Sequence, residues 1–210
     1  SGIDKSTLSK TVYHVLLESD SLRDVRQLAA HGGYEVIPAN RELAGAEVEL
    51  VEEERREQRL RSALAAVQAD YDYILIDCPP ALSLLTLNGL VAAHSVMIPM
   101  QCEYYALEGL SDLVNTVKKV RAYLNPQLEI EGLLRTMFDP RNALAQQVSD
   151  QLQRHFGDKV YATVIPRNIR LAEAPSYGKP VLFYDRASKG ALAYTALAGE
   201  FLQRREGALA

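Results

Sequence analysis

Short apolar runs alternate along the chain with longer segments in which apolar residues recur at helical spacing. The apolar runs predict strands, which we place at "YEVIPAN" (34–40), "YDYILID" (71–77), "HSVMIPMQ" (94–101), "LEIEGLLRTMF" (128–138) and "VYATVIP" (160–166). Most of these runs are continuously apolar rather than alternating, a pattern typical of a parallel sheet that is covered on both faces.

Helical patterns fill most of the chain between those strands. We predict helices over 7–19, 41–71, 82–93, 107–124, 143–157 and 188–205, with shorter helical or loop segments over 21–30 and 170–178. Within the second helix, the run "EEERREQR" (52–59) is expected to be a solvated face. Because no repeat or linker interrupts the pattern, we predict one α/β domain over residues 1–210, with a mostly parallel sheet and helices on both faces.

Composition adds a local charge asymmetry to this picture. The 210 residues are 48% apolar, and the net charge of −4 gives no global sign of nucleic-acid binding. Residues 1–134 hold 20 acidic and 12 basic residues, whereas residues 135–190 hold 5 acidic and 9 basic ones. The basic segment is either ordinary variation in surface composition or a local anion-binding surface, and both interpretations stay open at this point.

The two cysteines, Cys78 and Cys102, have no metal-ligand spacing and lie in apolar stretches, so we expect buried free thiols in a reducing cytosol. No Asp, Glu, Lys or Arg occurs between them, and that length would suit a membrane span. The same stretch contains Pro79, Pro80 and Pro99, so a strand end, a helix and a second strand explain it better. We therefore expect no membrane span.

The predicted strand 71–77 ends on the carboxylate of Asp77. In open α/β sheets, ligands bind beyond the carboxyl ends of the strands. A buried strand that ends in aspartate is what phosphate-handling enzymes use to hold Mg²⁺, usually through a water. Asp77 is therefore a candidate magnesium residue, unless it merely ends a strand, and Ser83 is a candidate cap of the next helix.

Four segments carry a family resemblance: "DCPPALSLLTLNGL" (77–90), "PMQCEYYALEGL" (99–110), "MFDPRNALAQQV" (137–148) and "VIPRNIRLAEAPSYGKPVLFYD" (164–185). With these segments in this order, the chain resembles the ParA/Soj family of chromosome- and plasmid-partition ATPases, of the deviant Walker P-loop class that includes MinD. The resemblance extends from about Ser1 to about Phe201. It implies a cytoplasmic, nucleoid-associated ATPase that binds ATP and Mg²⁺, forms an ATP-dependent homodimer, binds DNA non-specifically and works with a ParB-like partner, away from membranes.

The phosphate-binding part of that family pattern is absent. The family's loop resembles K-G-G-x-G-K followed by two Ser or Thr residues, but the only Gly-Gly pair here, Gly32-Gly33, is followed by Tyr34. The family's next block, a strand ending in D-x-D-P-Q-G-N, is also absent, and "SGIDKSTLSKTVYHVLL" resembles the segment that comes directly after that block in the family. We expect that roughly forty residues of such a protein are missing, about one βαβ part. In the family the first strand lies in the middle of the sheet, so its loss would leave two interior strands without a neighbour. The chain alone should then be marginally stable or aggregate, and it should not hydrolyse ATP.

The resemblance assigns nucleotide roles residue by residue. Asp77 would contact Mg²⁺ through water, and Pro79 and Pro80 would belong to a switch-like segment that senses the γ-phosphate. Pro166 and Asn168 would pack against and hydrogen-bond the adenine. Thr136 and Met137 would form another wall of the nucleotide site.

The resemblance also assigns a DNA surface to Arg141 and Arg170, which Lys179, Arg186 and Lys189 would extend. Basic side chains that meet phosphates bind DNA without sequence preference. Two further sets of residues have no assigned ligand: the first has two open interpretations, and the second is expected to lie in the core. Glu103, Tyr104 and Tyr105 either line a dimer face or pack on the core as a helix entry. The helically spaced Tyr194, Leu197, Ala198 and Phe201 are expected to pack in the core.

Three other functions compete with the partition ATPase. A MinD-like membrane ATPase needs a basic amphipathic terminal helix, which "FLQRREGALA" does not supply. An iron–sulfur carrier of the same fold needs paired cysteines at a dimer face, which Cys78 and Cys102 do not supply. A non-catalytic α/β interaction domain that has lost its phosphate loop stays open, and the encoding DNA upstream of Ser1 would distinguish it from a truncated enzyme.

Overall fold

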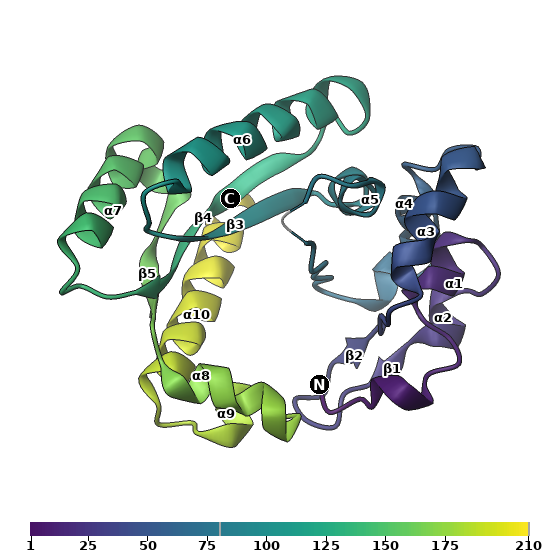
Figure 1. Ribbon diagram of the computed structural model, residues 1–210, viewed down its shortest axis with the longest axis horizontal. Helices are drawn as coiled ribbons and strands as arrows, with labels where there is room; N and C mark the ends of the chain where they lie inside the picture. The colour runs from purple at the N-terminus through teal and green to yellow at the C-terminus, as the bar shows by residue number, and fades with distance from the viewer. Residues whose placement is uncertain (80, 210) are drawn as a thin grey trace. The chain divides into compact units, whose positions relative to one another are not determined.

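The computed structural model describes residues 1–79 and 81–209, with side chains up to residue 206. The chain divides into two compact units, residues 1–95 with 117–129 and residues 96–116 with 130–210. Figure 1 labels the helices and strands along the chain. The elements up to α5 are α1 (Val12–Leu16), α2 (Leu22–Val25), β1 (Gln27–Leu28), β2 (Glu35–Val36), α3 (Leu43–Glu49), α4 (Arg59–Ala65) and α5 (Leu84–Ala92). The later elements are β3 (Ser95–Gln101), α6 (Ala106–Tyr123), β4 (Glu129–Phe138), α7 (Ala143–Phe156), β5 (Val160–Pro166), α8 (Ile169–Glu173), α9 (Val181–Tyr184) and α10 (Lys189–Leu209).

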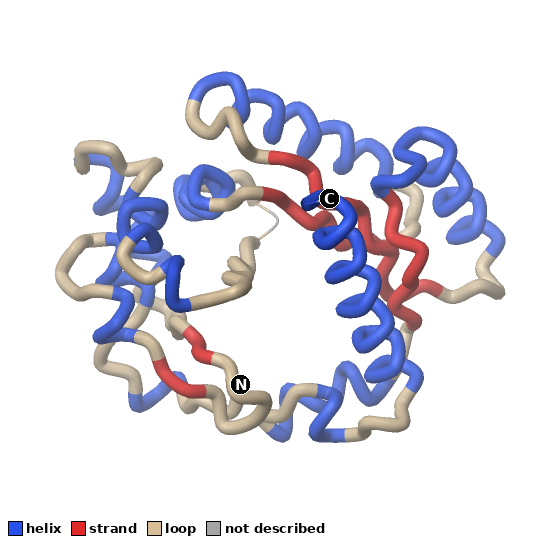
Figure 2. Tube along the Cα trace, turned by 180° about the vertical axis from the view of Figure 1, so that it is seen from behind, coloured by secondary structure: helices blue, strands red, loops and turns tan. Residues whose placement is uncertain are grey.

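The second unit is built on a three-stranded sheet in the order β3-β4-β5. Strands β4 and β5 run parallel, with Leu133 opposite Val160 and Phe138 opposite Pro166. The red strands of Figure 2 show the three side by side. These strands and helices α6, α7 and α10 agree with the apolar periodicity of the sequence, which confirms the predicted α/β class with a parallel sheet.

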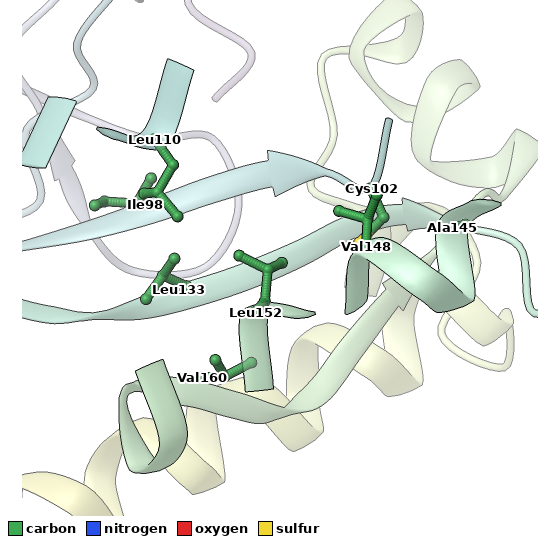
Figure 3. Close-up of a cluster of buried hydrophobic side chains, with 8 residues drawn as sticks. All are labelled: Ile98, Cys102, Leu110, Leu133, Ala145, Val148, Leu152 and Val160. Carbon is green, nitrogen blue, oxygen red and sulfur yellow. The ribbon is translucent and has the colours of Figure 1, made fainter. Parts of the chain in front are cut away.

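Helices cover both faces of this sheet. Successive strand residues point to opposite sides, so the apolar residues of each strand lie on both faces. Leu133 lies in a buried cluster with Leu110 of α6 and Leu152 of α7 (Figure 3). The next residue, Leu134, lies in a different cluster with Leu197 of α10. Each strand therefore divides its apolar side chains between two helical layers, which explains its continuously apolar sequence.

The strand predicted over residues 71–77 is the main correction to the fold. These residues form no strand, because the described sheets are β3-β4-β5 and the two-residue antiparallel pair of β1 and β2, and neither includes them. Tyr73, Ile74 and Leu75 are exposed, and Leu75 keeps 89% of its accessible surface. A strand needs the backbone of a neighbour, and apolar composition alone does not provide one.

The predicted helix 41–71 is likewise wrong in its middle. It is divided into α3 and α4, and Arg55 between them has a left-handed φ of 52°. The charge run is not wholly solvated, because Arg59 at its end is only 9% exposed. Its guanidinium lies 2.6 Å from a Glu18 oxygen and 2.7 Å from a Glu53 oxygen, and these two carboxylates compensate the buried charge.

Polar side chains bind the backbone at both ends of helix α5. Its N-cap Ser83 accepts a hydrogen bond from the Thr86 amide at 3.5 Å, as the sequence predicts. At the other end, Asn125 Nδ2 lies 2.8–3.1 Å from the carbonyl oxygens of Leu90, Val91 and Ala93. This side chain from a distant segment satisfies carbonyls that a helix end leaves without partners.

Candidate functional site

The segment that carries Asp77 rests on helix α5. A Cβ atom built on Gly89 would lie 2.7 Å from Cys78 Sγ and 3.5 Å from Ile76 Cγ2, so a larger residue at position 89 would have to displace the Cys78 sulfur. Thr86 Oγ1 donates to the carbonyl of Ala81 at 2.7 Å and lies 3.5 Å from that of Pro79. Helix α5 therefore supports this segment, although no ladder does.

Asp77 itself is exposed and ends no strand, which corrects the expectation that it lies at the end of a buried strand. The reason is the missing ladder, since neighbouring strands are what would bury both sides of such a segment. Pro79 is also exposed, and Pro80 lies outside the described residues. The magnesium and switch roles of this segment stay predictions.

The two cysteines differ from the expectation of two buried thiols. Cys102 is buried, as predicted, but Cys78 is exposed as a residue. Its sulfur nevertheless lies against α5, and burial of the sulfur, followed by the nearby charge of Asp77, raises the pKa of the Cys78 thiol. Cys78 is therefore mainly a neutral thiol at neutral pH.

The carboxyl ends of β4 and β5 bring four predicted nucleotide residues to one edge of the sheet. Phe138 and Pro166 are ladder partners, and the Arg167 amide donates to the Phe138 carbonyl at 3.3 Å. Thr136 and Met137 directly precede Phe138, and Asn168 follows Pro166 by two residues. The predicted base-binding residues therefore lie on neighbouring strand ends, where parallel sheets bind ligands.

Met137 adopts a left-handed backbone conformation, with φ of 49°. It lies between Arg135 and Phe138, where the register with β5 shifts, and its side chain is 42% exposed. Non-glycine residues rarely adopt this conformation, and such strain concentrates at functional sites. The strained position coincides with a residue that the family resemblance assigns to the nucleotide wall.

Asn168 caps helix α8, with its Oδ1 accepting from the Arg170 amide at 3.0 Å. Within the described residues, Nδ2 of the same side chain makes no hydrogen bond. The cap therefore holds the amide in one orientation and leaves a donor for a ligand. An amide donor suits the ring-nitrogen acceptors of a purine base.

Arg141 is held against Asp139 in a turn. Its Nε and Nη2 donate to the two Asp139 carboxylate oxygens at 2.9 and 2.8 Å, and its backbone amide donates at 3.0 Å. The side-chain hydrogen bonds and then the amide hydrogen bond lower the pKa of Asp139 to about 2, from 3.8. Arg141 is 89% exposed, so its side chain is available to solvent while its charge is locally compensated.

Arg170 is also compensated by carboxylates. Its Nη1 lies 2.7 Å from Glu173 Oε2, and its Nε lies 3.3 Å from Asp185 Oδ2. The Arg170 hydrogen bond, followed by one from Tyr184, lowers the pKa of Glu173. Arg170 therefore joins α8 to the residue that follows α9.

The remaining basic residues of the segment have a different environment. Lys179, Arg186 and Lys189 are exposed, and no ion pair joins them to any of the residues that the structure describes. Sequence reasoning missed Asp139, Glu173 and Asp185 as partners of the predicted DNA residues. The spacing of Arg170 and Glu173 on one helix could have indicated their pair, whereas nothing local indicates Asp185.

The exposure of the side chains shows which of the remaining residues pack in the core. Tyr104 and Tyr105 are 75% and 73% exposed, so they do not pack on the core, and their rings meet edge to face at 5.0 Å. Leu197 and Phe201 pack in a core cluster as expected. The core expectation for Tyr194 and Ala198 is wrong, because α10 turns these positions toward solvent.

The residues present fit only part of a magnesium–nucleotide ligand. The β4–β5 edge provides the side chains expected to meet a base. The 210 residues contain no phosphate loop, and the described part of the chain contains no cluster of three or more His, Cys, Asp or Glu residues able to hold a metal ion. Asp77 and Pro79 belong to the first unit, and the other predicted site residues belong to the second.

Comparison with known proteins gives consistent relatives over nearly the whole chain. A family model described as an AAA domain matches residues 1–130. The sporulation initiation inhibitor protein Soj of Bacillus subtilis is 53% identical over 199 residues, covering 95% of this chain and 79% of Soj. The chromosome partitioning protein ParA of Caulobacter vibrioides is 49% identical over 205 residues, covering 97% of this chain and 77% of that protein.

Among solved structures, cobyrinic acid a,c-diamide synthase from Mycobacterium smegmatis, with bound ATP analogue and magnesium, has a TM-score of 0.82 and 35% identity. The match covers 98% of this chain and 76% of that one. The fold is therefore that of the MinD/ParA-like P-loop NTPases. The chain belongs to the ParA/Soj family of chromosome-partitioning ATPases. Separately, none of the described helices is long and apolar enough to cross a membrane.

Proposed function

We propose that this chain acts in the segregation of chromosomal or plasmid DNA as a ParA/Soj-type ATPase that binds ATP and Mg²⁺, dimerises and binds DNA without sequence preference. The observation that carries the proposal is the β4–β5 edge. There, Met137 and Asn168 lie on neighbouring strand ends, one with a strained backbone and the other with a donor oriented by a helix cap. Relatives named for chromosome partitioning support the biological role.

The β4–β5 edge would bind the base. Pro166 would pack on its face, Asn168 Nδ2 would donate to a ring nitrogen, and Thr136 and Met137 would form the opposite wall. The triphosphate and Mg²⁺ need a phosphate loop that the 210 residues do not contain, although Asp77 is the proposed magnesium residue. We therefore expect no ATP hydrolysis by this chain alone.

The DNA surface would lie on the basic segment of the second unit. Arg141 and Arg170 are compensated by carboxylates, so binding there requires a phosphate to share the guanidinium with Asp139, or with Glu173 and Asp185. Lys179, Arg186 and Lys189 carry no such compensation within the described residues. An ATP-dependent dimer would join two such surfaces and multiply weak contacts. We propose that a ParB-like protein is the partner and that the complex lies on the nucleoid.

The test joins to Ser1 a segment that carries the family's phosphate-loop pattern, and it measures dimerisation and DNA binding with and without ATP. We expect both to require ATP. Arg141→Ala and Arg170→Ala should weaken DNA binding and lower the slope of log affinity against log salt by about 1 for each DNA phosphate that the variant no longer neutralises. Arg154→Ala, an exposed arginine on α7, is the matched control.

The readouts separate the parts of the proposal. Unchanged DNA affinity in both arginine variants would remove the basic-surface assignment. Unchanged ATP affinity in Asn168→Ala, with Asn142→Ala as control, would remove the base-site assignment. A joined protein that binds neither ATP nor DNA while remaining folded would contradict the function itself.

A further inference from the structure

We infer that helix α10 masks the free edge of β5 and so prevents a second copy of this chain from adding its own β5 to the sheet. Strand β5 ends the order β3-β4-β5, so among the strands that the structure describes none pairs with the other side of its backbone. Unpaired backbone at a sheet edge is a template for another strand. The inference rests on the fold and is independent of the proposed function.

A carboxylate from α10 occupies the free amides of this edge. The backbone amides of Ala162 and Thr163 both donate to Glu200, each at 2.8 Å. Burial raises the pKa of Glu200, but the hydrogen bonds from Thr163, Ala162 and Arg204 outweigh it and leave the pKa below its ordinary value. Glu200 therefore binds the two amides as an ionised carboxylate at neutral pH.

A guanidinium one turn further along α10 occupies carbonyls of the same edge. Arg204 donates to the carbonyl of Asp158 at 2.9 Å and to that of Val160 at 3.0 Å. The same side chain pairs with Glu200 at 2.8 Å and lies over the Tyr161 ring, 4.1 Å from its centroid. Together, Glu200 and Arg204 fill donors and acceptors over residues 158–163, as a neighbouring strand would.

The apolar face of α10 holds these two side chains in place. Leu197 and Phe201 pack in the cluster that contains Leu134 and Ile165 of the sheet. At the start of the helix, Gly190 lies so close to Leu171 that an added Cβ would be 2.6 Å from its Cγ. The helix is thus fixed at its start and along its middle, and α10 lies along β5 in Figure 1.

The sequence of β5 indicates that the strand most suited to pair with this edge is the β5 strand of a second copy, and helix α10 prevents that pairing. "VYATVI" (160–165) is rich in β-branched and aromatic residues and has no charge, proline or glycine. Such segments pair readily with identical segments. Two β5 edges can meet around a two-fold axis and use the same surface on both copies.

The test removes the Glu200 carboxylate, so that the amides of Ala162 and Thr163 lose their acceptor, and measures edge-to-edge pairing of two copies. The background carries Cys78→Ala, so that the exposed native thiol is gone, and Ala162→Cys as a reporter on β5. In this background, Glu200→Ala should raise the fraction of oxidation-linked dimer on the order of tenfold, because two amides lose a charged acceptor. Glu206→Ala, which removes an exposed carboxylate from the same helix, should leave the fraction unchanged.

Glu200→Gln keeps one oxygen acceptor for the two amides and should give an intermediate fraction of dimer. It is also the deciding variant if Glu200→Ala loses its far-ultraviolet circular dichroism signal. A folded Glu200 variant that stays monomeric at every concentration would overturn the inference. Equal cross-linking in Glu206→Ala would overturn it as well.

Discussion

The Cβ atom that Gly89 lacks would lie 2.7 Å from the sulfur of Cys78. This relationship lets the segment that carries Asp77 rest directly on helix α5. The close approach of Gly89 and Cys78 is therefore expected to contribute to the stability of this segment.

Gly89→Ala should destabilise the protein by about 1 kcal/mol, because overpacking of about 1–3 kcal/mol exceeds the gain of about 1 kcal/mol in helix propensity. Gly109→Ala is the matched control in α6, since an added Cβ there meets nothing within 4 Å. It should stabilise by about 1 kcal/mol. Adding Cys78→Ala to Gly89→Ala should recover the loss in urea unfolding, and an additive double variant would contradict the contact.

Asn125→Asp should cost about 3 kcal/mol or more, because it replaces a buried donor with an acceptor that faces three carbonyls. Asn142→Asp is the matched control. Asn142 caps α7 by accepting from the amides of Leu144 and Ala145, and aspartate accepts equally well there. Thermal unfolding monitored by circular dichroism should separate the two variants, and similar melting temperatures would rule out the proposed role of Asn125.

The Asp139 carboxyl should titrate with a pKa of about 2 in a carbon-detected NMR titration. Its pKa is lower in the folded state than the 3.8 of an unperturbed group, so the folded state favours the ionised form. The stabilisation is therefore present above about pH 4 and is lost as the pH falls toward 2. Arg141→Ala should move the titration up toward 3.8, Arg141→Lys should move it part of the way, and Arg154→Ala should not move it.

Met137→Gly should stabilise the protein by about 0.5–1 kcal/mol. The left-handed backbone conformation costs a residue with a side chain about 1–2 kcal/mol, which glycine avoids. Part of this stabilisation is lost because glycine has more conformational entropy in the unfolded chain. Thr136→Gly changes the preceding residue, which has no such conformation, and should destabilise by about 0.5–1 kcal/mol. Urea unfolding compares the two. If both variants lose stability equally, Met137 is not strained.

Local pattern was sufficient for much of this chain. The strands β3, β4 and β5 and the helices α5, α6, α7 and α10 follow directly from apolar periodicity and from caps such as Ser83. The base-site residues follow from family resemblance, and the register of Phe138 with Pro166 brings them to one edge. Whether these residues bind a nucleotide stays a prediction.

Tertiary structure decided what depends on partners far away in the sequence. Apolar side chains at 71–77 indicate a strand, but only a neighbouring backbone makes one, and the described sheets supply none. The sequence shows Arg170 as a basic residue, but its compensation by Asp185 depends on how the segment after α9 returns to α8. Periodicity reports which side of a segment prefers burial, whereas hydrogen bonds, ion pairs and strained torsions depend on which groups the folded chain brings within a few ångströms of each other.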